Sequence, residues 1–368
     1  MFFLTIETFA KSNFFAAIPT FFKEGAKRIV IIVASVLVWY KWLDFAGLMQ
    51  WFWASHVVIL VLLVVYLYKI GLWQLSENPF TRITAAMRTE MLNFSFYITL
   101  GNFGGLFIAK IDTLMLGAMV GLQDTGVYGM AAKLIMLIDL PRNAIQQVVM
   151  PLLAKAYKEN DLQTVESLYK KTALNQLIVG LLLLLLLVGS CEAIFALIPN
   201  GAAYKGGTSV LLFLGIAKVI DMGAGVNYEI LAFSKYYRIS AFLNLGLTAI
   251  SIFINLFFIK IYGFVGASYA IICIIILFNA VRGGVLYAVM GLQPFSTNAL
   301  KVVLLGAIVY ITDTFIPHYA SWSCFAALTD GALHAVVIFT IFMGGVLFFR
   351  LSPDISNSFE KNVRRLRG

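Results

Sequence analysis

Long apolar runs, each near the length of a membrane-spanning helix, recur along the whole chain. An α-helix needs about 20 predominantly apolar residues to cross the hydrocarbon core of a bilayer. We predict about ten such spans, at residues 28–43, 48–68, 92–118, 126–153, 168–189, 208–232, 237–259, 264–289, 299–317 and 332–350. The composition agrees, because 61% of the 368 residues are hydrophobic and only 12% are charged, whereas soluble domains are about a quarter charged. The predicted fold class is therefore all-α, as a polytopic membrane protein.

The basic residues predict how the helices are oriented. Among the 27 Lys and Arg residues, about twenty fall on one side if the N-terminal segment is cytoplasmic, and only Lys41, Lys205 and Lys260 fall in loops on the other side. This bias places both termini of the predicted multi-pass protein in the cytoplasm. The net charge of +9 is explained by this asymmetry, and we expect no nucleic-acid partner.

Ionisable residues inside the spans are the main functional signal. They occupy the third, fourth and sixth predicted spans and comprise Lys110, Asp112, Lys133, Asp139, Arg142, Lys218, Asp221 and Glu229. Each costs about 2.5–3.5 kcal/mol at a helix centre on the insertion scale, so such residues usually face a bundle interior or a wet cavity. Two interpretations stay open. The charges can pair to lock helices together, as the three-residue spacing of Asp139 with Arg142 and of Lys218 with Asp221 allows, or they can line a shared cavity.

The cationic half of this set suits an anionic substrate, because Arg and Lys are the side chains that bind phosphate. We predict that Lys110, Lys133, Arg142 and Lys218 bind the substrate. The acidic residues Asp112, Asp139, Asp221 and Glu229 would couple an ion, H+ or Na+, or tune those cations. Pro141 should kink the fourth span, as a proline inside a helix removes a hydrogen bond.

Other chemistry has little sequence support. His56, His318 and His334 are isolated, without metal-ligand spacing, and we interpret each as interfacial. We expect no metal and no cofactor. The chain also has no phosphate-cradling glycine loop and no nucleophile elbow. These observations favour a transporter over an enzyme.

Several segments resemble a known family. The segment "IAKIDTLMLGAMVGLQDTGVYGMAAKLI" at 108–135 resembles the opening of a lobe in the polysaccharide exporters, with Asp112, Gly121, Gly126, Tyr128 and Ala131 in the family pattern. Three other segments are similar to further helices of these proteins. They are 16–45, 141–157, which has paired prolines, and 230–270, which has a turn before "GASYA". The family comprises oligosaccharide-lipid flippases of the O-antigen type. It belongs to the superfamily of multidrug, oligosaccharidyl-lipid and polysaccharide exporters.

The resemblance implies a division of the chain. Residues 1–78 would be the remnant of a first helical lobe, with two spans and an N-terminal interfacial segment, and 79–91 a cytoplasmic linker. Residues 92–290 would form a complete second lobe of six helices, and 291–368 two extra helices with a basic cytoplasmic tail. Family members have two lobes of six helices, so we expect about four helices of the first lobe to be missing. The first lobe would then be incomplete.

The resemblance also implies the function. We expect a flippase that moves undecaprenyl-pyrophosphate-linked sugar repeats across the membrane by alternating access, for O-antigen or capsule biosynthesis. Its partners would be the lipid-linked oligosaccharide, membrane lipids and the glycan polymerase machinery. One alternative is a multidrug or cation antiporter of the same superfamily, although intramembrane cations disfavour it. The other is a membrane-bound glycan polymerase or ligase, for which the predicted outer loops are short.

Overall fold

The computed structural model describes residues 2–12, 17–71, 84–198, 201–317 and 324–367, and no strand occurs among them. The chain divides into two compact units, Met1–Arg88 and Thr89–Gly368, and each is considered by itself. Six helices of the described residues are long and apolar enough to cross a membrane. The predicted class, an all-α membrane protein, is confirmed. The division into four segments predicted from the sequence stays a prediction.

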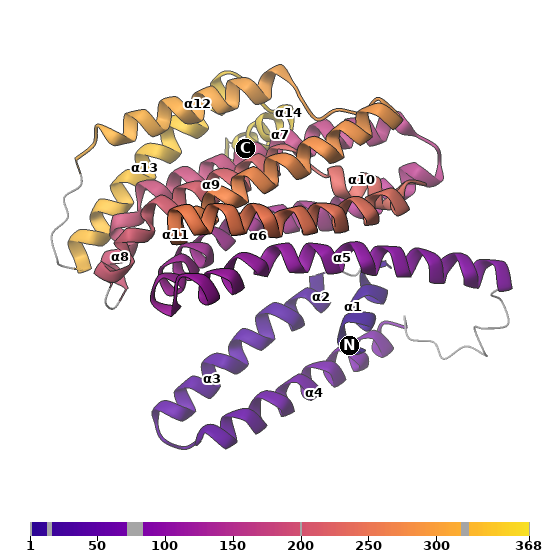
Figure 1. Ribbon diagram of the computed structural model, residues 1–368, viewed down its shortest axis with the longest axis horizontal. Helices are drawn as coiled ribbons and strands as arrows, with labels where there is room; N and C mark the ends of the chain where they lie inside the picture. The colour runs from indigo at the N-terminus through magenta and orange to yellow at the C-terminus, as the bar shows by residue number, and fades with distance from the viewer. Residues whose placement is uncertain (1, 13–16, 72–83, 199–200, 318–323, 368) are drawn as a thin grey trace. The chain divides into compact units, whose positions relative to one another are not determined.

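The first unit is built from short helices and one long apolar helix (Figure 1). Its elements are α1 (Phe2–Ser12), α2 (Ala17–Thr20), the π-helical turn η1 (Phe21–Ala26), α3 (Lys27–Trp39) and α4 (Phe45–Lys69). The Asp44 carboxylate caps α4 by accepting a hydrogen bond from the Gly47 amide at 2.7 Å, which satisfies a free donor of the first turn. Leu63 and Leu67 of α4 are fully buried against Ala10 of α1.

The second unit holds the remaining helices. They are α5 (Ala85–Met119), whose first residues precede the unit boundary, α6 (Leu122–Lys158), α7 (Leu162–Gly189), α8 (Cys191–Leu197), the 3₁₀ turn η3 (Gly201–Gly207), α9 (Thr208–Gly223), α10 (Asn227–Phe233), α11 (Tyr237–Met290), α12 (Thr297–Thr314), α13 (Cys324–Phe348) and α14 (Pro353–Arg367). Helices α6, α7 and α9 pack on one another, α11 packs on α9, and α12 and α13 pack on α7. This arrangement buries the apolar centre of the unit, including Tyr128, Ile138 and Met222.

Helix starts in this unit follow ordinary capping chemistry. The Asp161 carboxylate caps α7 by accepting hydrogen bonds from the Thr164 hydroxyl at 2.6 Å and the Thr164 amide at 3.0 Å. These bonds lower the pKa of Asp161, since they favour its charged form. Ser296 caps α12 in the same manner, through the amide of Ala299 at 3.2 Å. The polar residues between apolar runs thus fix where the helices begin.

Helix α11 is two helices joined by a sharp reversal at Gly263. This residue has φ 60° and ψ −140°, a conformation that is essentially restricted to glycine. The two halves fold back on each other and lie side by side in Figure 1. Leu247 of the first half packs on Ala270, Ile274 and Phe278 of the second. The reversal separates the predicted spans 237–259 and 264–289 and provides the turn expected before "GASYA".

The other predicted spans also fall on helices, but not every helix has the predicted character. Helix α3 has 13 residues, and the predicted span 208–232 is divided between α9 and α10. Helix α6 continues through Pro141 and Pro151 as one helix, so the proline does not interrupt it. The kink at Pro141 and the total of about ten crossings stay predictions.

The reversal in α11 generates a stability prediction. A Cβ atom on Gly266 would lie 2.1 Å from the Phe258 carbonyl oxygen, whereas one on Gly246 of the same helix would meet nothing within 4 Å. We expect Gly266→Ala to lower the free energy of unfolding by about 1–3 kcal/mol, because backbone must move to admit the methyl group. Gly246→Ala is the matched control and should be neutral or slightly stabilising. Thermal unfolding of the detergent-solubilised variants measures both, and equal stability of the two would contradict the close approach.

Candidate functional site

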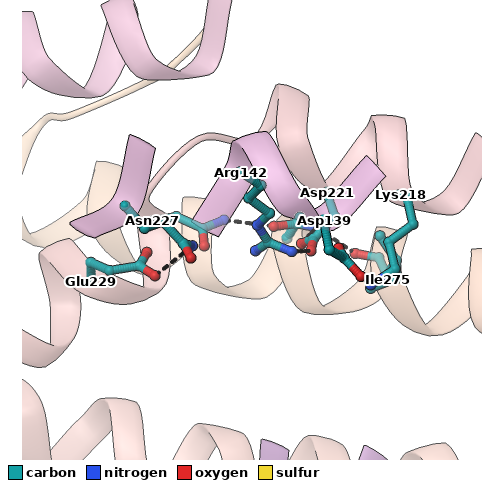
Figure 2. A network of polar contacts seen from close by, with 9 residues as sticks. Asp139, Arg142, Lys218, Asp221, Asn227, Glu229 and Ile275 are labelled. Carbon is teal, nitrogen blue, oxygen red and sulfur yellow. Dashed lines mark hydrogen bonds and ion pairs between the residues drawn. The ribbon is translucent and has the colours of Figure 1, made fainter. Parts of the chain in front are cut away.

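The charged residues of α6 and α9 face each other and pair across the helix interface. Arg142 of α6 forms an ion pair with Asp221 of α9. The Lys218 ammonium lies 3.0 Å from the Asp139 carboxylate. In Figure 2 the labelled side chains lie in a line that runs from Glu229 through Arg142 to Lys218. The two pairs between α6 and α9 replace the pairs within one helix that the three-residue spacings allowed.

Neutral amides extend this line into the neighbouring helices. Asn279 of α11 donates a hydrogen bond to Asp221 at 3.1 Å, and Asn227 of α10 donates one to Asn279 at 2.7 Å. Gln146 of α6 donates to Glu229 of α10 at 2.8 Å. Because Asp221 and Glu229 are buried, these bonds offset part of the cost of removing two carboxylates from water. The three amides connect four helices through one polar network.

Arg282 of α11 is a further cation, which falls within the predicted span 264–289 but was not included among the ionisable residues of the spans. Its guanidinium donates to Asn244 at 2.6 Å, which links the two halves of α11. The same group lies 4.9 Å from the centre of the Phe278 ring and 5.4 Å from that of Tyr228, in cation–π contact with both. Arg282 is therefore held inside the second unit beside the line of charges.

Two arginine atoms in this network retain hydrogen-bonding capacity. The Nε atoms of Arg142 and Arg282 are buried without a hydrogen-bond partner among the described residues. A buried N–H donor without a partner is costly. Each Nε–H could therefore donate to an anion or to water that enters the network. The amide side chains and Arg282 could be recognised in the sequence as members of this network only if all polar residues within the apolar runs were considered together, whether charged or not.

Lys110, Asp112 and Lys133 are placed differently. Asp112 of α5 is buried and accepts hydrogen bonds from the Tyr128 hydroxyl of α6 and, at 2.7 Å, from the Thr113 amide. Lys110 and Lys133 are exposed, and neither forms an ion pair with a described carboxylate. The structure thus brings Asp139, Arg142, Lys218, Asp221 and Glu229 into one network, and it leaves Lys110, Asp112 and Lys133 outside it. The roles predicted for all eight residues stay predictions.

An apolar cavity of about 1150 Å³ adjoins the network. Its walls come from α7, α9, the second half of α11 and α12, and include Leu181, Ile216 and Val303. Asn227 and Asn279 line the same cavity. The amides that bind Asp221 therefore also form a polar spot on an otherwise almost entirely apolar wall, which is the usual composition of a lipid or small-molecule site.

The interpretation of His334 as isolated and interfacial is wrong. His334 of α13 is completely buried, and it lies beside the carboxylates of Asp313 and Asp330. Sequence spacing did not reveal this because Asp313 is on a different helix. Among the described residues there is no group of three His, Cys, Asp or Glu side chains that could hold a metal ion.

The fold and the polar network define an all-α membrane protein with charges buried between its helices. Comparison with known families adds that residues 16–157 match the family described as polysaccharide biosynthesis protein. The resemblance to polysaccharide exporters is confirmed at this level. The matched part is less than half of the chain, and the resemblance expected for residues 230–270 lies outside it. A comparison with curated proteins gave no match.

The ion pair between α6 and α9 can be tested by a double-mutant cycle. We expect Arg142→Met and Asp221→Leu each to cost about 3–5 kcal/mol of unfolding free energy, because each leaves an unpaired buried charge. The double variant should be much less destabilised than the sum of the two. Lys155→Met is the matched control, since the Lys155–Glu159 pair is exposed at 3.9 Å and should contribute under about 1 kcal/mol. Additive effects of the two core substitutions would contradict a coupled pair.

Proposed function

We propose that the chain is a transporter for lipid-linked oligosaccharides, which carries undecaprenyl-pyrophosphate-linked sugar repeats across the cytoplasmic membrane by alternating access. The observation that supports it best is the juxtaposition of the apolar cavity with the partly buried cations, joined by Asn227 and Asn279. A lipid pyrophosphate has a long hydrocarbon chain and an anionic head. A site for it needs both an apolar wall and positive groups at one end of that wall.

The cations of the network suit a pyrophosphate head group because their donors can be shared between it and the carboxylates. Arg142 and Lys218 already have carboxylate partners, so an incoming pyrophosphate would have to share them. The buried Nε atoms of Arg142 and Arg282 provide donors that no described group uses. Sharing keeps the charge of the network near balance in both the empty and the occupied state. This arrangement limits the cost of an unpaired buried charge when the substrate leaves.

The family supports the direction of this proposal. Residues 16–157 match the family described as polysaccharide biosynthesis protein, and six of the described helices are long and apolar enough to cross a membrane. The resemblance to O-antigen-type flippases favours the bacterial inner membrane, and the distribution of Lys and Arg favours both termini in the cytoplasm. Membrane lipids and the glycan polymerase machinery would be its partners, and H+ or Na+ its coupling ion. No protein cofactor is needed, because transport changes no covalent bond.

The competing functions require different sites. A cation antiporter would present acidic groups to a cationic drug, yet every carboxylate of the α6–α9–α10 network has a cationic or amide partner. A glycan polymerase or ligase would carry its reactive groups on an aqueous outer loop. An assay of dye efflux and one of glycan-lipid transfer between leaflets separate the three functions.

The exposed cations give the sharpest transport prediction. We expect Lys133→Gln and Lys110→Gln each to reduce flipping of a lipid-linked oligosaccharide in reconstituted vesicles by about tenfold, the equivalent of about 1.4 kcal/mol of lost attraction. Neither lysine is paired with a described carboxylate, so protein stability should change little. Lys158→Gln, at the exposed end of α6, is the matched control and should flip at the parent rate. Unchanged flipping in both test variants would remove these lysines from the substrate path.

The cavity gives a second prediction. Gly284 lies on its wall, and a Cβ there would meet nothing within 4 Å, as is also true of Gly246 outside the cavity. We expect Gly284→Phe to fill part of the cavity and to lower photocrosslinking of a polyprenyl phosphate probe several-fold. Gly246→Phe in the same helix should leave crosslinking unchanged. Equal labelling of the two variants would show that the hydrocarbon chain binds elsewhere.

A further inference from the structure

The last helix of the chain, α14, begins directly after a helix that can cross a membrane. Helix α13 ends at Phe348, and α14 runs from Pro353 to Arg367. Only residues 349–352 separate the two helices, so α14 starts at the level at which α13 leaves the apolar part of the bilayer. With 15 residues, α14 is shorter than a membrane-spanning helix, and its many charges would be costly inside the bilayer. It therefore either lies along the membrane surface or extends into water.

The start of α14 is held against two other helices of the second unit. The carbonyl oxygen of the buried Leu351 accepts a hydrogen bond from the Asn298 amide of α12 at 3.0 Å. The Ser352 hydroxyl donates to the Asn175 side chain of α7 at 2.6 Å, and the Asn175 amide donates to Asp354 at 3.0 Å. These bonds fix where α14 begins and attach it to α7 and α12, which both line the apolar cavity.

The sequence of α14 has a single apolar side. Its apolar residues after Pro353 recur at intervals of four, four and three positions, as Ile355, Phe359, Val363 and Leu366. These intervals match one side of a helix, and polar residues occupy all the other positions. The pattern is typical of a helix whose apolar side is covered while its other sides face water.

The protein covers only the beginning of this apolar side. Ile355 is partly buried and packs against the core that contains Leu351. Phe359 lies one turn further along on the same side and is 52% exposed. Phe348 and Phe349, where α13 ends, are also exposed. Because the apolar side of α14 continues past the protein core at the level of the membrane surface, lipid is the cover that its position offers.

The charge of α14 changes along its length. Both acidic residues lie before position 361, at 354 and 360. The residues from 361 to 367 include four basic residues and no acidic one, and these are Lys361, Arg364, Arg365 and Arg367. A basic cluster next to a membrane span is attracted to negatively charged lipid over roughly a Debye length. The charge therefore complements anionic phospholipids better than zwitterionic ones.

We propose that α14 is a surface anchor that lies along the membrane. Its apolar side, at Phe359, inserts between the lipids, and its basic end binds the headgroups of anionic phospholipids. This role is separate from the proposed transport site, because α14 contributes no residue to the α6–α9 network. Since the start of α14 is bonded to α7 and α12, the anchor would connect two walls of the cavity to one leaflet, the cytoplasmic one in the predicted orientation.

The first experiment measures the depth of the helix. A chain whose native cysteines are replaced carries one nitroxide label, either at Phe359→Cys or at Asn357→Cys. Asn357 is the matched control, since it is exposed and lies on the opposite side of the same helix. In vesicles of phosphatidylcholine mixed with phosphatidylglycerol, the Phe359→Cys label should collide more with molecular oxygen than with an aqueous nickel complex. The Asn357→Cys label should show the reverse. Equal access of the nickel complex to both labels would overturn the proposal and leave this side of α14 to a protein partner.

The second experiment varies the charge of the lipid. In vesicles of phosphatidylcholine alone, the ratio of oxygen to nickel collisions at Phe359→Cys should fall several-fold. Added salt should lower the ratio in the mixed vesicles, because it screens attraction between exposed charges. A ratio that is the same with and without phosphatidylglycerol would overturn the assignment to anionic lipid.

The third experiment removes the basic end. The triple replacement of Arg364, Arg365 and Arg367 by Gln should lower the collision ratio at Phe359→Cys in mixed vesicles to the value found in phosphatidylcholine. The matched control replaces three exposed lysines of α6 and α7 by Gln, namely Lys155, Lys158 and Lys171, and should leave the ratio unchanged. Equal ratios in the two triple variants would contradict a role for the basic end of α14.

These readouts need no substrate and no transport assay. Failure of the flippase proposal would leave the label depths unchanged, and failure of the anchor would leave the α6–α9 network as the candidate transport site. The comparison of lipids uses a chain that keeps all its arginines, so the proposal can be tested even if the arginine variant does not accumulate.

Discussion

The cost of placing charge in an apolar interior is the constraint on which the second unit depends. Arg142 and Lys218 are held partly buried between helices because Asp221 and Asp139 face them from the opposite helix. The crossed pairing fixes how far α6 can slide or rotate on α9. The hydrogen bonds of Asn279 and Gln146 then attach α11 and α10 to the same line. The side chains that hold these helices together are therefore also those of the candidate site, so a substitution among them affects both helix packing and the site.

The two polar clusters solve this electrostatic problem in different ways. Between α6 and α9, each described cation has a fixed anionic partner, so the network is stable without a mobile ion and can admit an anion by sharing donors. Between α12 and α13, the buried imidazole of His334 lies beside the carboxylates of Asp313 and Asp330. The apolar cavity is bounded by helices from both regions.

The sequence was sufficient to predict the fold class but not to predict which charged side chains pair with each other. Hydropathy predicted where the long helices lie because lipid imposes a length and an apolar composition on each of them. The glycine reversal in α11 was visible from the resemblance to exporter helices. The pairing of the charges was not visible in the sequence, because Arg142 and Asp221 are far apart along the chain and the three-residue spacings offered closer partners. Arg282 was left out of the intramembrane ionisable residues although it falls within the predicted span 264–289, and Asn279 was overlooked because amides carry no charge.

The reversal at Gly263 has a consequence for biosynthesis. A turn of so few residues leaves no polar loop between the two halves of α11 that could wait in water while one half enters the bilayer. The ribosome would therefore have to deliver both halves to the insertion machinery before either is released into lipid. Insertion of this part of the chain is then a single event, in which some fifty residues enter the membrane as a preformed hairpin.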